Sequence, residues 1–270
     1  MAFTINVNPS GDSFDAEPGE SILEAGLRNN LGFPFSCKDG LCGACKGKIV
    51  SGTFDYGDKE ISGLSSIEQS LGQALFCQAK PSSDLEVEIA LAAPLPTTKK
   101  LPCKVIRKEI LSHEVVALWL KCPPTEKLQF LAGQYIDILL KDGRYRSFSI
   151  ANAPSDDELI ELHIRHIDGG EFTGYCYYDM QEKEILRIHG PLGNFYLRED
   201  TDRPLIFMAG GTGFAPIKGI IEHAIANNIS REMHLYWGVR SQRDLYHDAL
   251  ARKWAVDHPH IHYIPVLSEP

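Results

Sequence analysis

Four cysteines form the most specific chemical pattern in the chain. They are Cys37, Cys42, Cys45 and Cys77, arranged as C-x4-C-x2-C with the fourth cysteine well downstream. This spacing is typical of a [2Fe–2S] cluster, in which one short loop supplies three thiolates and a separate segment supplies the fourth. Gly40 and Gly43 stand between the ligands, where a backbone without side chains can approach a cluster closely. Structural zinc is the alternative, although zinc ligands more often come as paired C-x2-C or histidine-containing knuckles.

A second candidate site is the segment Arg146-Ser147-Phe148-Ser149, at the end of an expected strand. Arg146, Phe148 and Ser149 offer a cation, an aromatic face and a hydroxyl, which suit the phosphate, the ring face and the N5 edge of a flavin. By themselves they could equally form a mixed strand face. Further along, Gly170 and Thr173 precede a short expected helix, whose first amides and threonine hydroxyl would suit a pyrophosphate.

A third candidate site follows the expected strand Leu205–Ala209. The turn Gly210-Gly211-Thr212-Gly213 leads into a helix at residues 215–225, and a glycine turn at a helix start binds anions. It is not the G-x-G-x-x-G dinucleotide fingerprint. Arg240 ends the next strand, where an open parallel sheet binds ligands, so it either pairs with a nucleotide phosphate or is an exposed cation. Nearby arginines would help to bind the 2′-phosphate of NADPH, whereas Asp244 would hydrogen-bond the free ribose hydroxyl of NADH, so both cofactors stay open and NADH is preferred.

Composition narrows the class of protein. The chain has 270 residues and a net charge of −9, of which residues 1–93 account for −7. An acidic chain is a poor partner for nucleic acid, whereas an acidic face on an electron carrier could steer a basic redox partner. No apolar run reaches the roughly 18 residues that span a membrane, and no secretory signal is evident. With an odd number of cysteines and four of them expected as ligands, a reducing cytoplasm is predicted.

The pattern of elements predicts three domains. Residues 1–93 combine strands at 2–7, 47–54 and 85–89 with a helix at about 22–30, which the capping box Ser21-x-x-Glu24 begins. Residues 94–100 are rich in proline and read as a linker. In residues 101–200, strands expected at 103–111, 115–121, 134–140, 145–150 and 159–166 predict an antiparallel barrel, and a turn is expected at 190–195. Residues 201–270 alternate strands, at 205–209, 234–239 and 261–266, with helices expected at 215–225 and 244–254, which predicts a parallel sheet.

These segments resemble known families. The first third resembles plant-type ferredoxins of the β-grasp fold. The second resembles the FAD-binding barrel of the ferredoxin–NADP⁺ reductase superfamily, whose Arg-x-Tyr-Ser motif appears here with Phe148 in place of tyrosine. Gly-Gly-Thr-Gly-Phe-Ala-Pro at residues 210–216 is similar to that superfamily's nicotinamide and pyrophosphate segment. In this order the modules resemble NAD(P)H-dependent iron–sulfur flavoprotein reductases over nearly the whole chain.

The resemblance implies an electron relay. Nicotinamide delivers a hydride, whereas a [2Fe–2S] cluster carries one electron at a time, so FAD must stand between them with Ser149 near its N5. The resemblance also implies that His163 and Arg165, which face the same way on one strand, line the middle of the flavin. The expected redox partner is a dehydrase of 3,6-dideoxysugar biosynthesis or, as the alternative, a ring-hydroxylating or multicomponent oxygenase.

Family members continue for several more strands, with a Cys-Gly-x-Pro-type segment near the nicotinamide. We therefore expect an incomplete nucleotide domain here, and reduction of the cluster by dithionite but slowly or not at all by NADH. Two hypotheses of other classes remain, a non-enzymatic electron-carrier fragment and a zinc-stabilised binding module. His258, His260 and His262 alternate, so a strand could present them on one side to a metal. Such alternation is common and no carboxylate or cysteine partner is evident, so a metal site is not expected there. Cys103, Cys122 and Cys176 are expected to fill core space.

Overall fold

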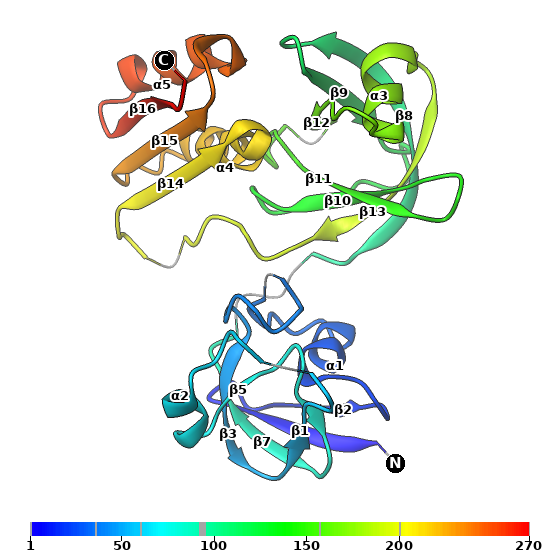
Figure 1. Cartoon of the computed structure of the whole chain (residues 1–270), viewed down its shortest axis with the longest axis vertical. Coiled ribbons are helices and arrows are strands. Elements are labelled where there is room, and N and C mark those ends of the chain that lie inside the picture. Colours follow the sequence, from blue (N-terminus) through cyan, green and yellow to red (C-terminus); the bar gives the residue numbers. More distant parts are fainter. Residues whose placement is uncertain are drawn as a thin grey trace. The chain divides into compact units, whose positions relative to one another are not determined.

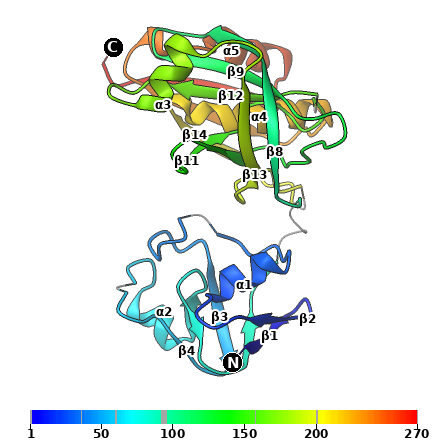
Figure 2. The ribbon, with the colours of Figure 1, turned by 90° about the vertical axis from the view of Figure 1, so that its right-hand side faces the viewer.

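The computed structural model describes residues 2–35, 37–59, 61–91, 96–156, 158–199 and 201–269. The chain divides into two compact units, residues 1–95 and 96–270 (Figures 1 and 2). Positions 94 and 95 of the predicted linker lie outside the described residues, and its last two residues already belong to a strand. Within the described chain, no helix is long and apolar enough to cross a membrane.

The first unit is built on a mixed five-stranded sheet of order β2-β1-β7-β3-β5. Its strands are β1 (Phe3–Asn8), β2 (Asp12–Ala16), β3 (Lys46–Ser51), β5 (Gln73–Leu75) and β7 (Leu85–Glu88). β1 runs parallel to β7, whereas the neighbouring pairs β1–β2 and β3–β7 are antiparallel. A separate pair joins β4 (Phe54–Asp55) to β6 (Lys80–Pro81). This sheet, with a helix packed beside it, is the predicted β-grasp fold.

That helix, α1 (Ile22–Arg28), begins at the predicted capping box. The Ser21 hydroxyl accepts a hydrogen bond from the Glu24 amide at 3.2 Å, and the Glu24 carboxylate accepts one from the Ser21 amide at 2.9 Å. Both donors would otherwise be unpaired at the helix start. Ile22 and Leu23 are buried in the core of this unit. A second capping box, which the sequence analysis missed, begins α2 (Ser66–Ser70).

The second unit opens with a six-stranded antiparallel sheet of order β11-β10-β13-β8-β9-β12. Its strands are β8 (Lys99–Ile110), β9 (Val115–Lys121), β10 (Tyr135–Leu139), β11 (Tyr145–Ser149), β12 (Ile160–Arg165) and β13 (Ile185–Leu192). An antiparallel bridge between Ile150 and Leu162 joins the ends of the order, so the sheet curls into a barrel. α3 (Glu171–Gly174) continues as a π-helical turn at Tyr175–Asp179.

The rest of this unit is a parallel sheet of order β14-β15-β16. Its strands are β14 (Leu205–Gly210), β15 (Met233–Val239) and β16 (Ile261–Leu267), connected through α4 (Phe214–Ala226) and α5 (Asp248–Asp257). Phe214 of α4 stacks on Trp237 of β15 with ring centroids 3.9 Å apart, and Trp254 of α5 stacks on Phe214. Both helices therefore cover one face of the sheet. On the opposite face of β14, Ile206 and Met208 are 70% and 81% exposed.

Two element predictions were wrong. The helix expected from Asp244 begins at Asp248, because Gln242–Asp244 form a 3₁₀ turn with its own capping box and Leu245 then leaves the helical region at ψ 68°. The turn expected at residues 190–195 begins later, because β13 continues through Leu192. Pro191 lacks a backbone donor, and the partner strand β10 shifts register between Tyr135 and Asp137, opposite that proline.

Candidate cofactor sites

The four cysteines of the first unit come from two segments that hydrogen bonds hold together. The first three lie on the loop between α1 and β3, and Cys77 follows β5. The Phe76 amide donates to the Cys45 carbonyl at 3.0 Å, and the Leu23 amide in the first turn of α1 donates to the Phe76 carbonyl at 2.9 Å. The helix start and the ligand loop therefore both fix the segment that carries Cys77.

The thiols approach one another in two pairs, Cys37 with Cys42 and Cys45 with Cys77. The Asp39 amide, which donates to Cys37 Sγ at 3.4 Å, lowers the pKa of Cys37 to about 7. In the more buried pair, the hydrogen bond from Cys45 lowers the pKa of Cys77 to about 6. One thiol of each pair is therefore prepared to be a thiolate, the form that binds metal.

The loop geometry fits a cluster with two irons. Gly40 and Gly43 have φ of +76° and +73°, and a Cβ at Gly40 would lie 3.1 Å from Ile61 Cδ1. Backbone amides directed at sulfur are a feature of iron–sulfur sites. A tetrahedral zinc site would hold all its sulfurs about 3.8 Å apart. Among the described residues, no three of these thiols have sulfurs that all lie within 4.8 Å of one another. Two separated pairs suit two metal ions better than one.

The residues predicted to bind flavin are brought together only in part. Phe148 of β11 packs against Phe172 of α3, with ring centroids 5.8 Å apart, so the Arg-Ser-Phe-Ser strand and the Gly-Gly-x-x-Thr turn are neighbours. The Thr173 hydroxyl is engaged inside its own turn, where it accepts from the Ile167 amide and donates to the Gly170 carbonyl, each at 3.2 Å. Arg146 is exposed and Ser149 is half-buried. Their flavin contacts stay a prediction.

His163 and Arg165 have different surroundings although they alternate on β12. His163 is 4% exposed, and its ring nitrogens lie 2.8 Å from Glu161 Oε1 and 3.1 Å from the Tyr246 hydroxyl. Arg165 is half-buried and forms an ion pair with Glu114 at 3.0 Å. Both nitrogens of His163 are thus used by the protein, and its predicted flavin contact stays untested.

Glu161 and His163 belong to a buried network that links β12 to α4. Lys218 of α4 is 6% exposed, and its ammonium donates to Glu161 and Glu222, each at 2.9 Å, and to the Ala151 carbonyl at 3.1 Å. Burial alone would raise the pKa of Glu161, but His163 and Lys218 together lower it to about 2. A charged Glu161 accepts from Nε2 of His163, so Nδ1 of that ring accepts from the Tyr246 hydroxyl.

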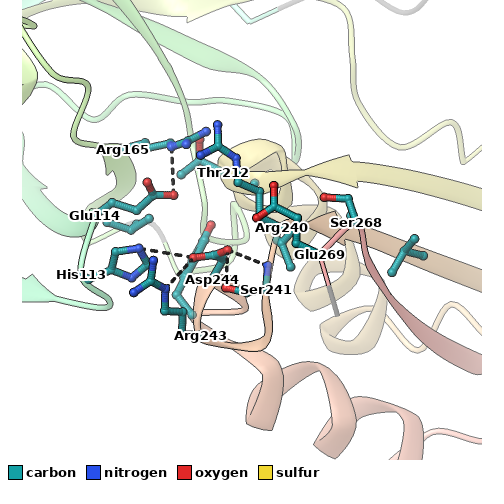
Figure 3. Close-up of a pocket in the computed structure, with 16 residues that line it drawn as sticks. His113, Glu114, Arg165, Thr212, Arg240, Ser241, Arg243, Asp244, Ser268 and Glu269 are labelled. Carbon is teal, nitrogen blue, oxygen red and sulfur yellow. Dashed lines mark hydrogen bonds and ion pairs between the residues drawn. The ribbon is translucent and has the colours of Figure 1, made fainter.

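A pocket of about 490 Å³ opens where the parallel strands end, and Figure 3 shows its side chains. Of the residues predicted to bind nucleotide, Gly211, Thr212 and Arg240 line it, as does Arg165 from the barrel. Gly210 and Gly213 lie in the same turn but not on the pocket wall. The Trp237 indole donates to the Gly211 carbonyl at 2.9 Å and fixes the turn. Two arginines, Arg165 and Arg240, and the glycine turn thus face one cavity, an arrangement that suits an anion.

Sequence reasoning named Asp244 but missed His113 and Glu114, which line the same pocket. His113 and Glu114 come from the β8–β9 turn, far from Asp244 in the chain, yet His113 Nε2 lies 3.4 Å from Asp244 Oδ1. Asp244 also accepts from the Ser241 amide and hydroxyl, at 2.8 and 2.9 Å. Partial burial opposes ionisation, but these bonds and the His113 and Arg243 charges lower the pKa of Asp244. From the sequence, Asp244 was expected only as a partner for a ribose hydroxyl, and no local pattern signals its contact with His113.

Comparison with known proteins agrees with this geometry. Family models match residues 5–82 as a 2Fe-2S iron-sulfur cluster binding domain, 102–196 as an oxidoreductase FAD-binding domain and 207–270 as an oxidoreductase NAD-binding domain. A CDP-6-deoxy-L-threo-D-glycero-4-hexulose-3-dehydrase reductase from Yersinia pestis is 40% identical, over 99% of this chain and 80% of the relative. The chain belongs to the NAD(P)H-dependent iron–sulfur flavoprotein reductases.

Two further relatives widen the comparison. The reductase subunit of an aromatic O-demethylase from Amycolatopsis is 37% identical, over 100% of this chain and 81% of that protein. The crystal structure of an Amycolatopsis cytochrome P450 reductase superposes with a TM-score of 0.76 at 35% identity, over 99% of this chain and 81% of that one. This reductase is thus an oxidoreductase that uses a [2Fe–2S] cluster, FAD and a nicotinamide cofactor to pass electrons to a partner.

Proposed function

We propose that this reductase draws electrons from NADH and delivers them to a dehydrase that acts on a CDP-6-deoxyhexulose in 3,6-dideoxysugar biosynthesis. The observation that carries the proposal is the 40% identity, over nearly the whole chain, to the Yersinia dehydrase reductase. The proposed activity is that of a CDP-6-deoxy-3,4-glucoseen reductase. The preference for NADH is supported by Asp244, a carboxylate in the nucleotide pocket that would repel a 2′-phosphate.

The proposed cluster ligands are Cys37, Cys42, Cys45 and Cys77. Because the thiols occur as two pairs, we assign Cys37 and Cys42 to one iron and Cys45 and Cys77 to the other. The Asp39 amide donates to Cys37 and the Gly40 amide donates to Cys77, and both hydrogen bonds stabilise negative charge on the sulfurs. The thiolate pairs and the amides together supply what a [2Fe–2S] cluster requires from a protein.

The proposed flavin residues are Arg146, Phe148, Ser149, Gly170, Thr173 and, across the pocket, Arg165, with Ser149 as the group nearest N5. When bound, FAD accepts a hydride from the nicotinamide and releases electrons singly to the cluster. The proposed residues for NADH are Gly210, Gly211, Thr212, Gly213 and Arg240. Here the fixed glycine turn leaves room for the pyrophosphate, and Arg240 and Arg165 balance its charge. His163 positions this wall of the pocket through Tyr246.

The proposal includes the boundaries of the domains. We propose a ferredoxin domain at residues 1–93, a linker at 94–100, an FAD-binding barrel at 101–200 and a nicotinamide domain at 201–270. We also propose a cytoplasmic location, because the relay consumes NADH and needs reduced thiols, and all seven cysteines are free.

The test is an anaerobic assay that contains this reductase, the dehydrase named in its Yersinia relative, that dehydrase's CDP-sugar intermediate and NADH. We expect slow consumption of NADH that depends on both the dehydrase and the sugar. Cytochrome c serves as a general one-electron acceptor, and dithionite gives the fully reduced spectrum for comparison. Reduction of cytochrome c without any turnover of the sugar would refute the dehydrase assignment and leave the relay intact.

An oxygenase component is the second candidate acceptor. The 37% identity to the reductase subunit of an aromatic O-demethylase favours it, since that relative is matched over an equal share of its length. The same assay separates the two candidates when an aromatic O-demethylase oxygenase and its substrate replace the dehydrase and the sugar. Faster NADH consumption with the oxygenase would reverse the order of preference.

A further inference from the structure

Two histidines and a glutamate converge on the exposed face of the parallel sheet, away from α4 and α5. His234 of β15 and His262 of β16 are direct partners across the parallel pair. Their rings are stacked, with centroids 4.7 Å apart and planes 23° apart. Glu232 immediately precedes β15, and its Oε1 lies 2.6 Å from Nε2 of His262. One donor atom from each residue lies within 4.8 Å of the other two.

The sheet fixes the backbone positions of all three residues. The two histidines belong to paired strands, and the Glu232 carbonyl accepts from the Leu205 amide of β14 at 2.7 Å. Glu232 and His262 have side chains that are 50% and 42% exposed, so an ion can reach them from solvent. Ligands held by a sheet lose little freedom when they bind an ion, which favours binding.

The local charges distinguish this group from the two other His/acid groups in the described part of the chain. The group of Glu161, His163 and His247 has the Lys218 ammonium bonded to its glutamate. The group of His113, Glu114 and Asp244 lies among the arginines of the nucleotide pocket. At Glu232 the adjacent cation turns away, because the Arg231 guanidinium donates to the Arg203 carbonyl at 2.9 and 2.7 Å.

We propose that Glu232, His234 and His262 form a binding site for a divalent transition ion of the zinc class. Two imidazoles and one carboxylate are a ligand set that zinc uses, with water in the remaining position. Binding would replace the Glu232–His262 hydrogen bond by two bonds to the ion and would join β15 to β16 through their side chains. The site lies at the amino ends of the strands, roughly 16 Å along β15 from the nucleotide pocket at their carboxyl ends. It is therefore independent of the cofactor relay.

The test measures zinc and iron in the same sample of the tag-free, cluster-loaded reductase. The protein is incubated with excess Zn²⁺, desalted and analysed by inductively coupled plasma mass spectrometry, and the affinity is obtained by titration calorimetry. We expect one zinc per chain in addition to the iron. His234→Ala and His262→Ala should each weaken the affinity at least about tenfold, which is what losing even an outer-shell partner of a metal site costs.

The matched control is the double variant His258→Ala, His260→Ala. This nearby pair has ring centroids 6.0 Å apart and belongs to no His/acid group in the described residues. It should bind zinc as the unaltered chain does. Equal zinc affinity in the His234 and His262 variants, or an equal loss in the control, would overturn the proposal. Iron and flavin contents show that each variant is folded, and a failure of the relay assay would leave the zinc measurement unaffected.

Discussion

At the residue scale, Lys218 is a charged side chain buried inside the second unit. All three of its donors are used, by Glu161, Glu222 and the Ala151 carbonyl. Burial alone would lower the pKa of Lys218, yet the two carboxylates raise it, so the ammonium stays charged inside the protein. The ion pair with Glu161 joins α4 to β12, so this side chain ties α4 to the barrel.

Replacing Lys218 should therefore be costly. Lys218→Met keeps the aliphatic bulk but leaves Glu161 buried without its cation, and losing one partner of a buried pair typically costs about 3–5 kcal/mol. Urea unfolding measures the loss. The control is Lys253→Met on α5, where an exposed ion pair with Asp257 is removed and a change of only about 0.5 kcal/mol is expected. Similar losses of unfolding free energy in the two variants would mean that the buried ion pair stabilises the protein no more than the exposed one.

The same network predicts how stability depends on pH. Burial, and then the charges of His163 and Lys218, lower the pKa of His247 to about 4, and burial lowers that of His163. Unfolded histidine titrates near about 6.5, so the unfolded chain binds more protons below that pH. Stability should fall as pH drops from about 6.5 towards 4, followed by a further loss between about 4.5 and 2, where Glu161 is protonated in the unfolded chain but still charged in the folded one.

His247→Asn isolates the histidine contribution to this pH dependence. We expect melting temperatures of the unaltered protein to fall between pH 6.5 and 4, and those of the variant to fall less steeply. His258, which is outside the network, supplies the control variant His258→Asn. Parallel melting curves for all three proteins would show that His247 is protonated equally in the folded and unfolded states.

At the element scale, α4 approaches the barrel through a glycine. A Cβ on Gly219 would lie 2.8 Å from the Asn152 carbonyl oxygen and 3.4 Å from that of Ile150, so only glycine lets the helix pack this closely. Alanine favours helices by about 1 kcal/mol over glycine. Here the clash is with backbone, which cannot rotate away, so overpacking should dominate.

Gly219→Ala is expected to destabilise the second unit by roughly 1–3 kcal/mol, as overpacked cores usually do. Chemical denaturation followed by tryptophan fluorescence reports on this unit, since Trp237 and Trp254 lie in its core. Gly213→Ala is the control for stability, because a Cβ there meets nothing within 4 Å. A Gly219→Ala protein as stable as the control would mean that α4 shifts at no cost.

The elements also show what a sequence can predict. β9 was predicted at residues 115–121 and β15 within a residue, because apolar alternation reports burial directly. The predicted start of α5 was wrong because Ser241 and Asp244 cap a 3₁₀ turn rather than the helix. The continuation of β13 through Pro191 was missed because it depends on a register shift in the partner strand β10. The contact between His113 and Asp244 escaped prediction since the two residues meet only through folding, whereas the cysteine spacing is local.

At the scale of the whole molecule, the proposed cluster cysteines and the proposed nucleotide pocket belong to different compact units. Among the described residues, the core from Ile5 to Ile89 is formed by the first unit alone, and those that line the pocket all lie beyond residue 112. Loss of the cluster should therefore leave the entry of electrons intact while blocking their exit.

Cys45→Ser tests this separation. Serine removes one proposed iron ligand at a buried position of the first unit, so we expect iron content to fall strongly. Flavin content and the rate at which NADH bleaches the flavin should stay within about twofold of the unaltered protein, because the second unit has its own cores. Reduction of cytochrome c should fall at least about tenfold if the cluster is the exit.

Cys176→Ser, which alters a buried thiol of the barrel, is the converse control: it should keep its iron, since that cysteine lies in the other unit. Parallel loss of flavin and iron in Cys45→Ser would show that the two units fold only together, and undiminished cytochrome c reduction would place the exit at the flavin.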